Sequence, residues 1–278
     1  MSISLPTYTR RETPLLGRSK RVGAIITTGL RRELRRPASI VVTGIGAAFT
    51  TIVSILIVYL APFLFPGQLR DLSFFYLPAS NVAILFFVPL MSAVVGSGLI
   101  ADDLHSMALT LYFSRPITHA DYVLAKAAIL GPLISLVSVL PLVITPIVAA
   151  LLGFFPWDVA LAAIGLSIPA GVLFGGVYTA ATLFLSSLTT RRAYAGAGVF
   201  AMTFGLLFPA QILANATGNS VFLYASAWEN YLAVARALFG APQTTIDWPP
   251  ALAILLGATT LAALATYARM RTREVVAT

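Results

Sequence analysis

The stretch from Ala101 to Lys126, ADDLHSMALTLYFSRPITHADYVLAK, is the longest polar interruption between two apolar segments that also carries helix signals. Asp102 and Asp103 stand where an N-cap and a first-turn acid are expected. Arg115 falls in the last turn and Pro116 ends the pattern. Between them, apolar residues recur at helical spacing: Leu104, Met107, Ala108, Leu111 and Tyr112. The stretch therefore predicts an amphipathic connector helix over 102–116, bounded at both ends, between two membrane spans.

The composition around this stretch is that of a membrane protein. The chain has 278 residues, of which 58% are hydrophobic and 10% charged, and its mean hydropathy is +0.89. A soluble domain carries about 25% charged residues. Apolar runs long enough to cross a hydrocarbon core of about 30 Å recur along the chain. We expect an all-α, polytopic membrane protein with six transmembrane helices, at 38–62, 80–101, 122–152, 158–187, 194–213 and 249–268.

Two of these spans have features of their own. The capping box of Thr118 and Asp121 predicts where the third span begins. The third and fourth spans are long, which indicates either tilt or a break at a proline. The candidate prolines are Pro132, Pro141 and Pro146 in the third span and Pro169 in the fourth.

The remaining segments divide the chain into a transmembrane domain, 19–268, and two cytoplasmic tails, 1–18 and 269–278. Residues 19–36 predict an interfacial helix with basic residues off its apolar stripe, which comprises Val22, Ile25, Ile26, Gly29, Leu30 and Leu34. The alternative is a plain basic flank that orients the first span. The extracytoplasmic segment 214–248 has intermediate polarity. It predicts either short amphipathic helices that dip into the outer leaflet or an exposed loop.

The basic residues indicate how the chain lies in the cytoplasmic membrane. Of its 18 Lys and Arg residues, only Arg70 and Arg236 fall in predicted outer segments. The positive-inside rule therefore places both termini in the cytoplasm. Because the basic residues stand at span ends, the net charge of +8 does not indicate nucleic-acid binding. Aromatic residues are expected to mark the outer interface: Phe63, Phe65, Phe74, Phe75, Tyr76, Phe154, Phe155, Trp157 and Trp248.

The chain lacks the residues that several classes of function usually require. No ionisable residue falls in the middle of a predicted span, which argues against an ion-coupled carrier, although carbonyls of broken helices can also bind ions. The chain has no G-x-x-x-x-G-K-[ST] phosphate loop. Its two histidines, His105 and His119, both lie near the connector and do not form a metal-ligand pattern. We therefore expect no catalytic residues, no metal site and no cofactor bound by this chain.

On these residues the chain resembles the permease subunits of ABC-2-type exporters over nearly its whole length. The resemblance rests on a basic amphipathic helix before the first span, six spans with both ends inside, and the connector. The matching connector residues are the acidic pair Asp102 and Asp103, the apolar run Leu109, Leu111, Tyr112 and Phe113, the motif Ser114, Arg115 and Pro116, and then Lys126. The chain departs from the family at Met107, where Gly is usual, and at Thr110, where an acid is common.

The resemblance implies an export function driven by a separate ABC ATPase subunit, which binds ATP and Mg, and a second permease copy, identical or paralogous. The residues that it implies for ATPase coupling are Asp102, Asp103, Leu104, Met107, Leu109, Leu111, Tyr112, Arg115 and Pro116. Small residues of the fifth span favour close helix approach and predict the dimer interface: Ala193, Gly196, Ala197, Gly198 and Ala201. Gly171 and Gly175 of the fourth span offer a further G-x-x-x-G contact.

Two alternatives stay open, namely an ion-coupled secondary carrier or channel and, less favoured, a membrane enzyme or structural protein. The apolar, uncharged spans fit lipids, drugs or other amphiphiles better than free ions as substrates. Membrane lipids are expected partners and nucleic acid is not.

Overall fold

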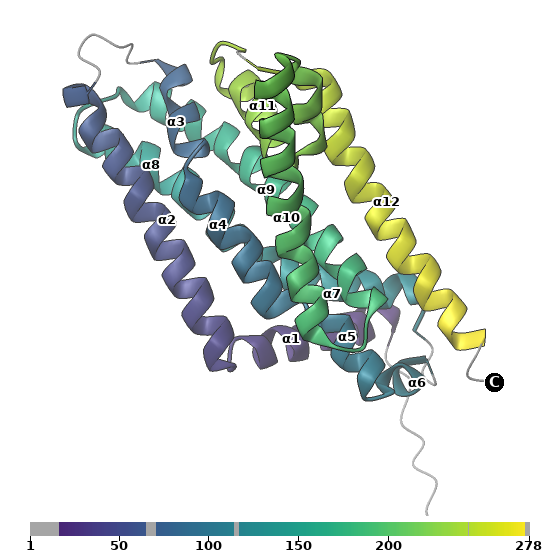
Figure 1. Ribbon diagram of the computed structural model, residues 1–278. Helices are drawn as coiled ribbons and strands as arrows, with labels where there is room; N and C mark the ends of the chain where they lie inside the picture. The colour runs from purple at the N-terminus through teal and green to yellow at the C-terminus, as the bar shows by residue number, and fades with distance from the viewer. Residues whose placement is uncertain (1–16, 65–70, 114–116, 244, 276–278) are drawn as a thin grey trace, which may run out of the picture.

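The computed structural model describes residues 17–64, 71–113, 117–243 and 245–275, and all the secondary structure in these ranges is helical (Figure 1). Six helical runs are long and apolar enough to cross a membrane: Pro37–Leu60, Val82–His105, His119–Leu151, Trp157–Leu188, Arg192–Thr217 and Trp248–Thr272. They agree with the six predicted spans to within a few residues. The all-α fold class is therefore confirmed, and the arrangement is that of a multi-pass membrane protein.

The first helix lies across the N-terminal end of the first span. Helix α1 (Arg18–Glu33) ends in a short turn, and α2 (Pro37–Leu64) begins with a proline, whose missing N–H is not needed there. The apolar stripe of α1 faces the bundle, because Ile26 and Leu30 pack against the core. Gly29 approaches the side chain of Ile129 on α7 so closely that a Cβ atom would collide with it. A packed helix, rather than a plain basic flank, therefore occupies this segment.

The second span is interrupted in its C-terminal half. It consists of α4 (Val82–Met91), the π-helical turn η2 (Ser92–Gly96) and α5 (Gly98–His105). Ser186 of α9 reaches the start of α5, where its Oγ accepts hydrogen bonds from the N–H of Ile100 at 3.1 Å and of Ala101 at 2.9 Å. The same hydroxyl donates to the Ser97 carbonyl at 2.7 Å. A neighbouring span thus satisfies the backbone groups that the interruption exposes.

The third span is broken and the fourth is not. Helices α7 (His119–Ser138) and α8 (Leu140–Leu151) are separated at Val139, whereas α9 (Trp157–Leu188) continues through Pro169. Gly171 packs on the break, where an added Cβ would lie 2.8 Å from Val139 Cα. Gly175 meets Ser138 on the same face of α9. The G-x-x-x-G pair is therefore used inside the chain, and the prediction that it contacts a second copy is wrong.

The end of the bundle opposite α1 is closed by short helices. These are η1 (Leu72–Phe75), α3 (Tyr76–Ala79), η3 (Ser220–Ala225) and α11 (Ala227–Phe239), the last two lying between α10 (Arg192–Thr217) and α12 (Trp248–Val275). Trp228 and Tyr231 of α11 pack against Phe174 of α9, with ring centroids 5.5 and 4.5 Å away, respectively. Most of residues 220–239 are thus helical and packed by their aromatic side chains, and they do not form an exposed loop. The predicted tail at 269–278 needs correction, since α12 continues to Val275.

The aromatic residues at this end divide between two roles. Phe75 and Phe155 are buried against each other, with ring centroids 4.9 Å apart, so they belong to the core. Trp157 and Trp248 are exposed at the starts of α9 and α12, where an interfacial anchor is expected. Only part of the predicted outer aromatic set is therefore available to the membrane interface.

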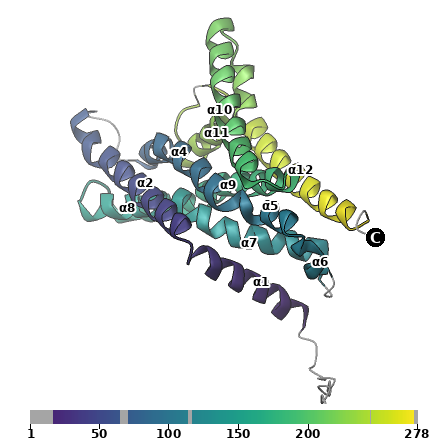
Figure 2. The same cartoon turned by 60° about the horizontal axis from the view of Figure 1, so that its bottom comes forward.

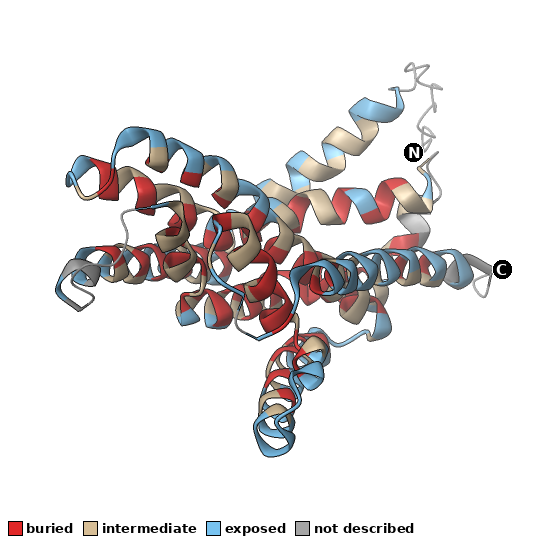
Figure 3. Cartoon of the chain, turned by 90° about the horizontal axis from the view of Figure 1, so that it is seen from above, coloured by how far each residue is buried: buried red, intermediate tan, exposed pale blue. Residues whose placement is uncertain are grey.

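Burial is highest in the second and third spans and lowest in α2, α10 and α12, which form the periphery. Figure 3 shows α12, the helix that leads to the C-terminus, as exposed along most of its length. The exposed side chains of these three helices include large apolar ones, such as Ile52, Phe208 and Leu261. In water, such surfaces would cause association, whereas hydrocarbon chains cover them without cost.

Candidate functional site

The centre of the candidate site is a buried ion pair between the second and third spans. Asp103 of α5 and Lys126 of α7 are 8% and 6% exposed, and Lys126 Nζ lies 2.6 Å from Asp103 Oδ2. The hydroxyl of Tyr122, also on α7, donates to the same carboxylate oxygen at 2.7 Å. A buried charge of either sign is stable only when it is paired and hydrogen-bonded. These contacts therefore form a polar joint between α5 and α7.

Two tyrosine rings cover the joint. Helix α6 (Ala108–Phe113) places Tyr112 against Tyr122, with ring centroids 5.4 Å apart. The ammonium group of Lys126 lies 5.8 Å from the Tyr112 ring centroid and 5.2 Å from that of Tyr122, within the range of a cation–π contact. Burial, and then the nearby Asp103 charge, raise the pKa of the Tyr112 phenol. Tyr112 is therefore an uncharged side chain that packs over the joint and connects α6 to it.

Helix α1 is held to the same region at both of its ends. At its start, Arg18 donates from Nη2 to Asp121 Oδ1 at 2.8 Å and from Nε to both carboxylate oxygens at 3.1 Å. This contact raises the pKa of Arg18. Asp121 also completes the predicted capping box with Thr118, which confirms the start of α7. At the other end, the buried Glu33 accepts a hydrogen bond from Ser39 at 2.8 Å.

A cavity of about 290 Å³ lies between α1, α5, α6 and α7, which gather on one side of the bundle (Figure 2). Its charged lining residues carry both signs and balance: Arg32, Glu33, Arg36, Asp102, Asp103 and Lys126. Thr28, Tyr112 and apolar residues of α1, α5 and α7 complete the walls. Such a cavity can hold a small polar or zwitterionic group, and it leaves space into which α1 and α6 can shift.

The structure corrects the predicted connector. Asp102 and Asp103 are the fifth and sixth residues of α5, so they do not begin a helix and the predicted N-cap is wrong. The second span simply continues past the expected boundary at 101. The connector is also not one helix, because α5 ends at His105 and α6 begins at Ala108. Met107 between them has a φ of +54°, a left-handed conformation that a continuous helix excludes.

The predicted coupling residues therefore divide into inward-facing and outward-facing sets. Asp103 and Leu109 are buried, and Leu104 and Tyr112 pack partly against the core. Asp102 is half-buried, and Met107 is 75% exposed. The side chain of Leu111, together with Arg115 and Pro116, lies outside the described residues.

The predicted dimer residues on α10 divide in the same way. Ala193, Ala197 and Ala201 are exposed and stand one above another at intervals of four residues. Gly196 faces Ala93, and Gly198 faces Leu185, both within the same chain. The two glycines therefore make contacts within the chain, and their assignment to a dimer interface stays a prediction. The three alanines stay available for one.

Sequence reasoning did not identify the Asp103–Lys126 pair or the role of Glu33. A usable signal was present, because an acidic pair, Asp102 and Asp103, and a base, Lys126, stood at adjacent ends of two consecutive spans. Ionisable groups at that depth almost always find a partner. Among the described residues, no group of three or more His, Cys, Asp or Glu could hold a metal ion.

The fold and its six apolar helical runs define the class: an all-α, multi-pass membrane protein. Comparison of the sequence with protein-family models and with curated proteins found no match.

Proposed function

We propose that the chain is the permease subunit of an ATP-driven exporter of the ABC-2 type. The observation that carries this proposal is the polar joint at Asp103 and Lys126. It connects α5, α6 and α7 at the end of the bundle where α1 also lies. The exposed turn from His105 to Met107 is directly continuous with this joint. A partner that moves the turn would therefore move two spans together.

Two further features support the proposal. Apart from Arg236, the described basic residues lie on or just after α1, at Lys126, at the start of α10 and near the end of α12, and by the positive-inside rule this distribution supports a cytoplasmic side for these ends. A partner ATPase would reach the joint from that side. The exposed row of Ala193, Ala197 and Ala201 on α10 suits close approach of a second copy, because small side chains let helix backbones come near each other.

The first experiment tests the partner. The chain is co-expressed with the ATPase encoded nearest to its own gene, and recovery of the ATPase on the affinity-tagged permease is measured. Met107→Asp puts a charge at the exposed turn, and we expect recovery to fall at least tenfold. Thr27→Asp is the matched control, since Thr27 is exposed on α1 away from the turn. Equal recovery with both variants contradicts the proposed contact.

The second experiment tests the energy source. Liposomes with the permease and its ATPase should hydrolyse ATP faster than the ATPase alone, with ionophores present to remove gradients. Liposomes with the permease alone, loaded with a pH-sensitive dye, should show no proton movement beyond that of empty liposomes. Proton movement by the permease alone would favour the secondary carrier or channel.

A further inference from the structure

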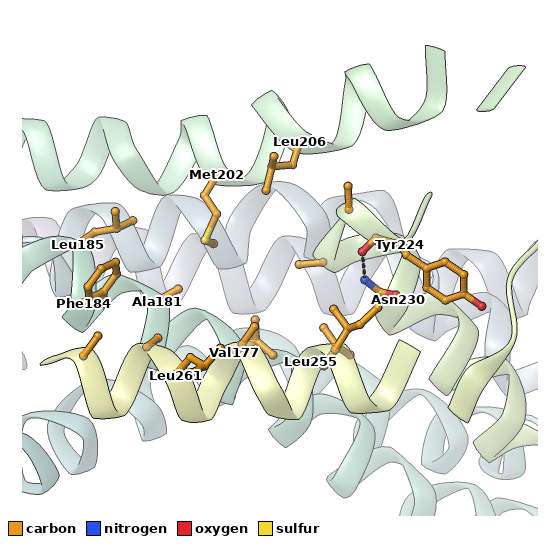
Figure 4. A pocket seen from close by; sticks show the side chains of 16 residues that line it. Val177, Ala181, Phe184, Leu185, Met202, Leu206, Tyr224, Asn230, Leu255 and Leu261 are labelled. Carbon is orange, nitrogen blue, oxygen red and sulfur yellow. Dashed lines mark hydrogen bonds between the residues drawn. The ribbon is translucent and has the colours of Figure 1, made fainter. Parts of the chain in front are cut away.

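A second cavity lies far from the polar joint, between α9, α10, α11 and α12. Its volume is about 490 Å³ (Figure 4). Helix α9 packs against both α10 and α12, and Figure 1 shows the end of α10 and the start of α12 close together near α11, from where the two helices diverge. The cavity occupies the wedge between them. Its walls come from Val177 and Phe184 on α9, Met202 and Leu206 on α10, and Leu255 and Leu261 on α12.

The wedge opens toward the surroundings of the bundle at the depth of the spans. Leu206 and Leu261, on its two rims, are exposed, as expected where a cavity meets the bilayer. The lining on α12 runs from Ile254 to Ala265, which corresponds to about 16 Å of helix. The volume lies in the range of ligand pockets, and an apolar space left empty would forfeit the dispersion contacts of its walls. An extended hydrocarbon chain entering from the bilayer fits this long, apolar shape.

One polar side chain stands out at the α11 end of the cavity. Asn230 is 1% exposed, and its Nδ2 donates to the Tyr224 carbonyl at 2.8 Å and to the Ser226 carbonyl at 2.9 Å. These two bonds define the orientation of the amide, because a flipped amide would set an oxygen against two carbonyl oxygens. Asn230 Oδ1 is buried and has no hydrogen-bond partner among the described residues. A buried acceptor of this kind needs a donor, and none of the described residues provides one.

We propose that the cavity binds one single-chain amphiphile from the bilayer, with its alkyl chain between α10 and α12 and a head-group hydroxyl donating to Asn230 Oδ1. The long apolar wedge selects the alkyl chain, and Asn230 selects a neutral donor at its end. A carboxylate head group is disfavoured, because it offers an acceptor to an acceptor in an apolar setting. The cavity and the polar joint share no lining residue, so this inference stands independently of the proposed function.

The test uses a monoacylglycerol with a diazirine in its alkyl chain, photo-crosslinked to the purified protein in nanodiscs. We expect saturable labelling of peptides from α9, α10 and α12, suppressed by unlabelled monoacylglycerol. Ala258→Trp fills the cavity from α12 and should reduce this labelling at least tenfold. Ala263→Trp is the matched control, because Ala263 is exposed on the same helix and does not line the cavity. Non-saturable labelling of outer faces, unchanged in Ala258→Trp, would overturn the proposal.

A second pair of variants ensures that the result does not depend on whether Ala258→Trp folds. Leu206→Trp fills the cavity from α10, and Phe208→Trp is its exposed control on that helix. Asn230 is tested through the ligand, because its own replacement would also remove two hydrogen bonds within the chain. A monoacylglycerol with both hydroxyls methylated should compete about fivefold more weakly, as expected for one lost hydrogen bond. Equal competition by the methylated compound would overturn the role of Asn230.

Discussion

At the scale of single residues, charge and backbone conformation concentrate in the connector. Asp103 and Lys126 are buried in one joint, and Tyr122 provides a further hydrogen bond to the carboxylate. Met107, two residues after α5 ends at His105, adopts a positive φ. Both features have consequences for stability that can be measured on the purified protein.

Replacing Lys126 with Met should destabilise the protein by about 3–5 kcal/mol, because Asp103 then stays buried without its counter-charge. The double variant Asp103→Leu with Lys126→Met should recover most of this loss, since apolar residues of similar size tolerate burial. Thermal unfolding in detergent provides the measurement. Asp102→Asn is the control and should change stability by less than about 0.5 kcal/mol, because Asp102 is only half-buried. A single variant that behaves like this control would show that the pair is not a stabilising joint.

Replacing Met107 with Gly should stabilise the protein by about 1 kcal/mol, because glycine adopts the left-handed conformation without a Cβ penalty. The reverse exchange, Gly240→Ala at a φ of +71° after α11, should lose a similar amount. Denaturant unfolding of both variants gives the comparison. If Met107→Gly lowers stability, side-chain contacts of Met107 outweigh its backbone strain.

At the scale of elements, the break in the third span depends on α9. Ser138, the last residue of α7, donates to the Gly171 carbonyl at 2.9 Å. Ser167 donates to the carbonyl of Leu142 at 2.9 Å, which Pro146 leaves without its helical donor. Helix α9 thus supplies the partners that a broken or proline-containing helix needs inside a bilayer.

The tight contact of α9 with this break should tolerate no added carbon at Gly171. Gly171→Ala places a methyl group against the backbone of Val139 and Ser138, and we expect a loss of about 1–3 kcal/mol. Gly176→Ala is the matched control on the same helix, because an added Cβ there has no atom within 4 Å in the described structure. The control should be neutral or slightly stabilising. Equal melting temperatures for the two variants would contradict the close packing seen at Gly171.

At the scale of the whole molecule, the six spans place the polar joint and the α11 region at opposite ends of the bundle (Figure 1). The joint is surrounded by basic helix ends, whereas α11 covers the other end. The charge asymmetry therefore predicts one orientation of the molecule in the membrane.

Single cysteines can test this orientation directly, because the natural sequence contains none. Met107→Cys and Val221→Cys introduce exposed thiols at the two ends. In intact cells, a membrane-impermeant maleimide should label Val221→Cys, whereas Met107→Cys should require permeabilised cells. The cysteine-free parent protein is the control for background labelling. Labelling of both thiols in intact cells would contradict the two-sided topology, and the opposite pattern would reverse the orientation.

Local sequence patterns predicted the six spans and the capping box at Thr118, and they favoured a helix before the first span. These features depend on local composition, since crossing hydrocarbon requires about 20 apolar residues and a cap requires only a nearby side chain. Tertiary structure decided which polar and small residues meet. Asp103 pairs with Lys126, and Gly171 packs within the chain, because helix rotation and crossing determine which faces touch. The third span breaks at Val139 and not at Pro146 because the carbonyl freed at Leu142 finds a donor on α9, which no local pattern reveals.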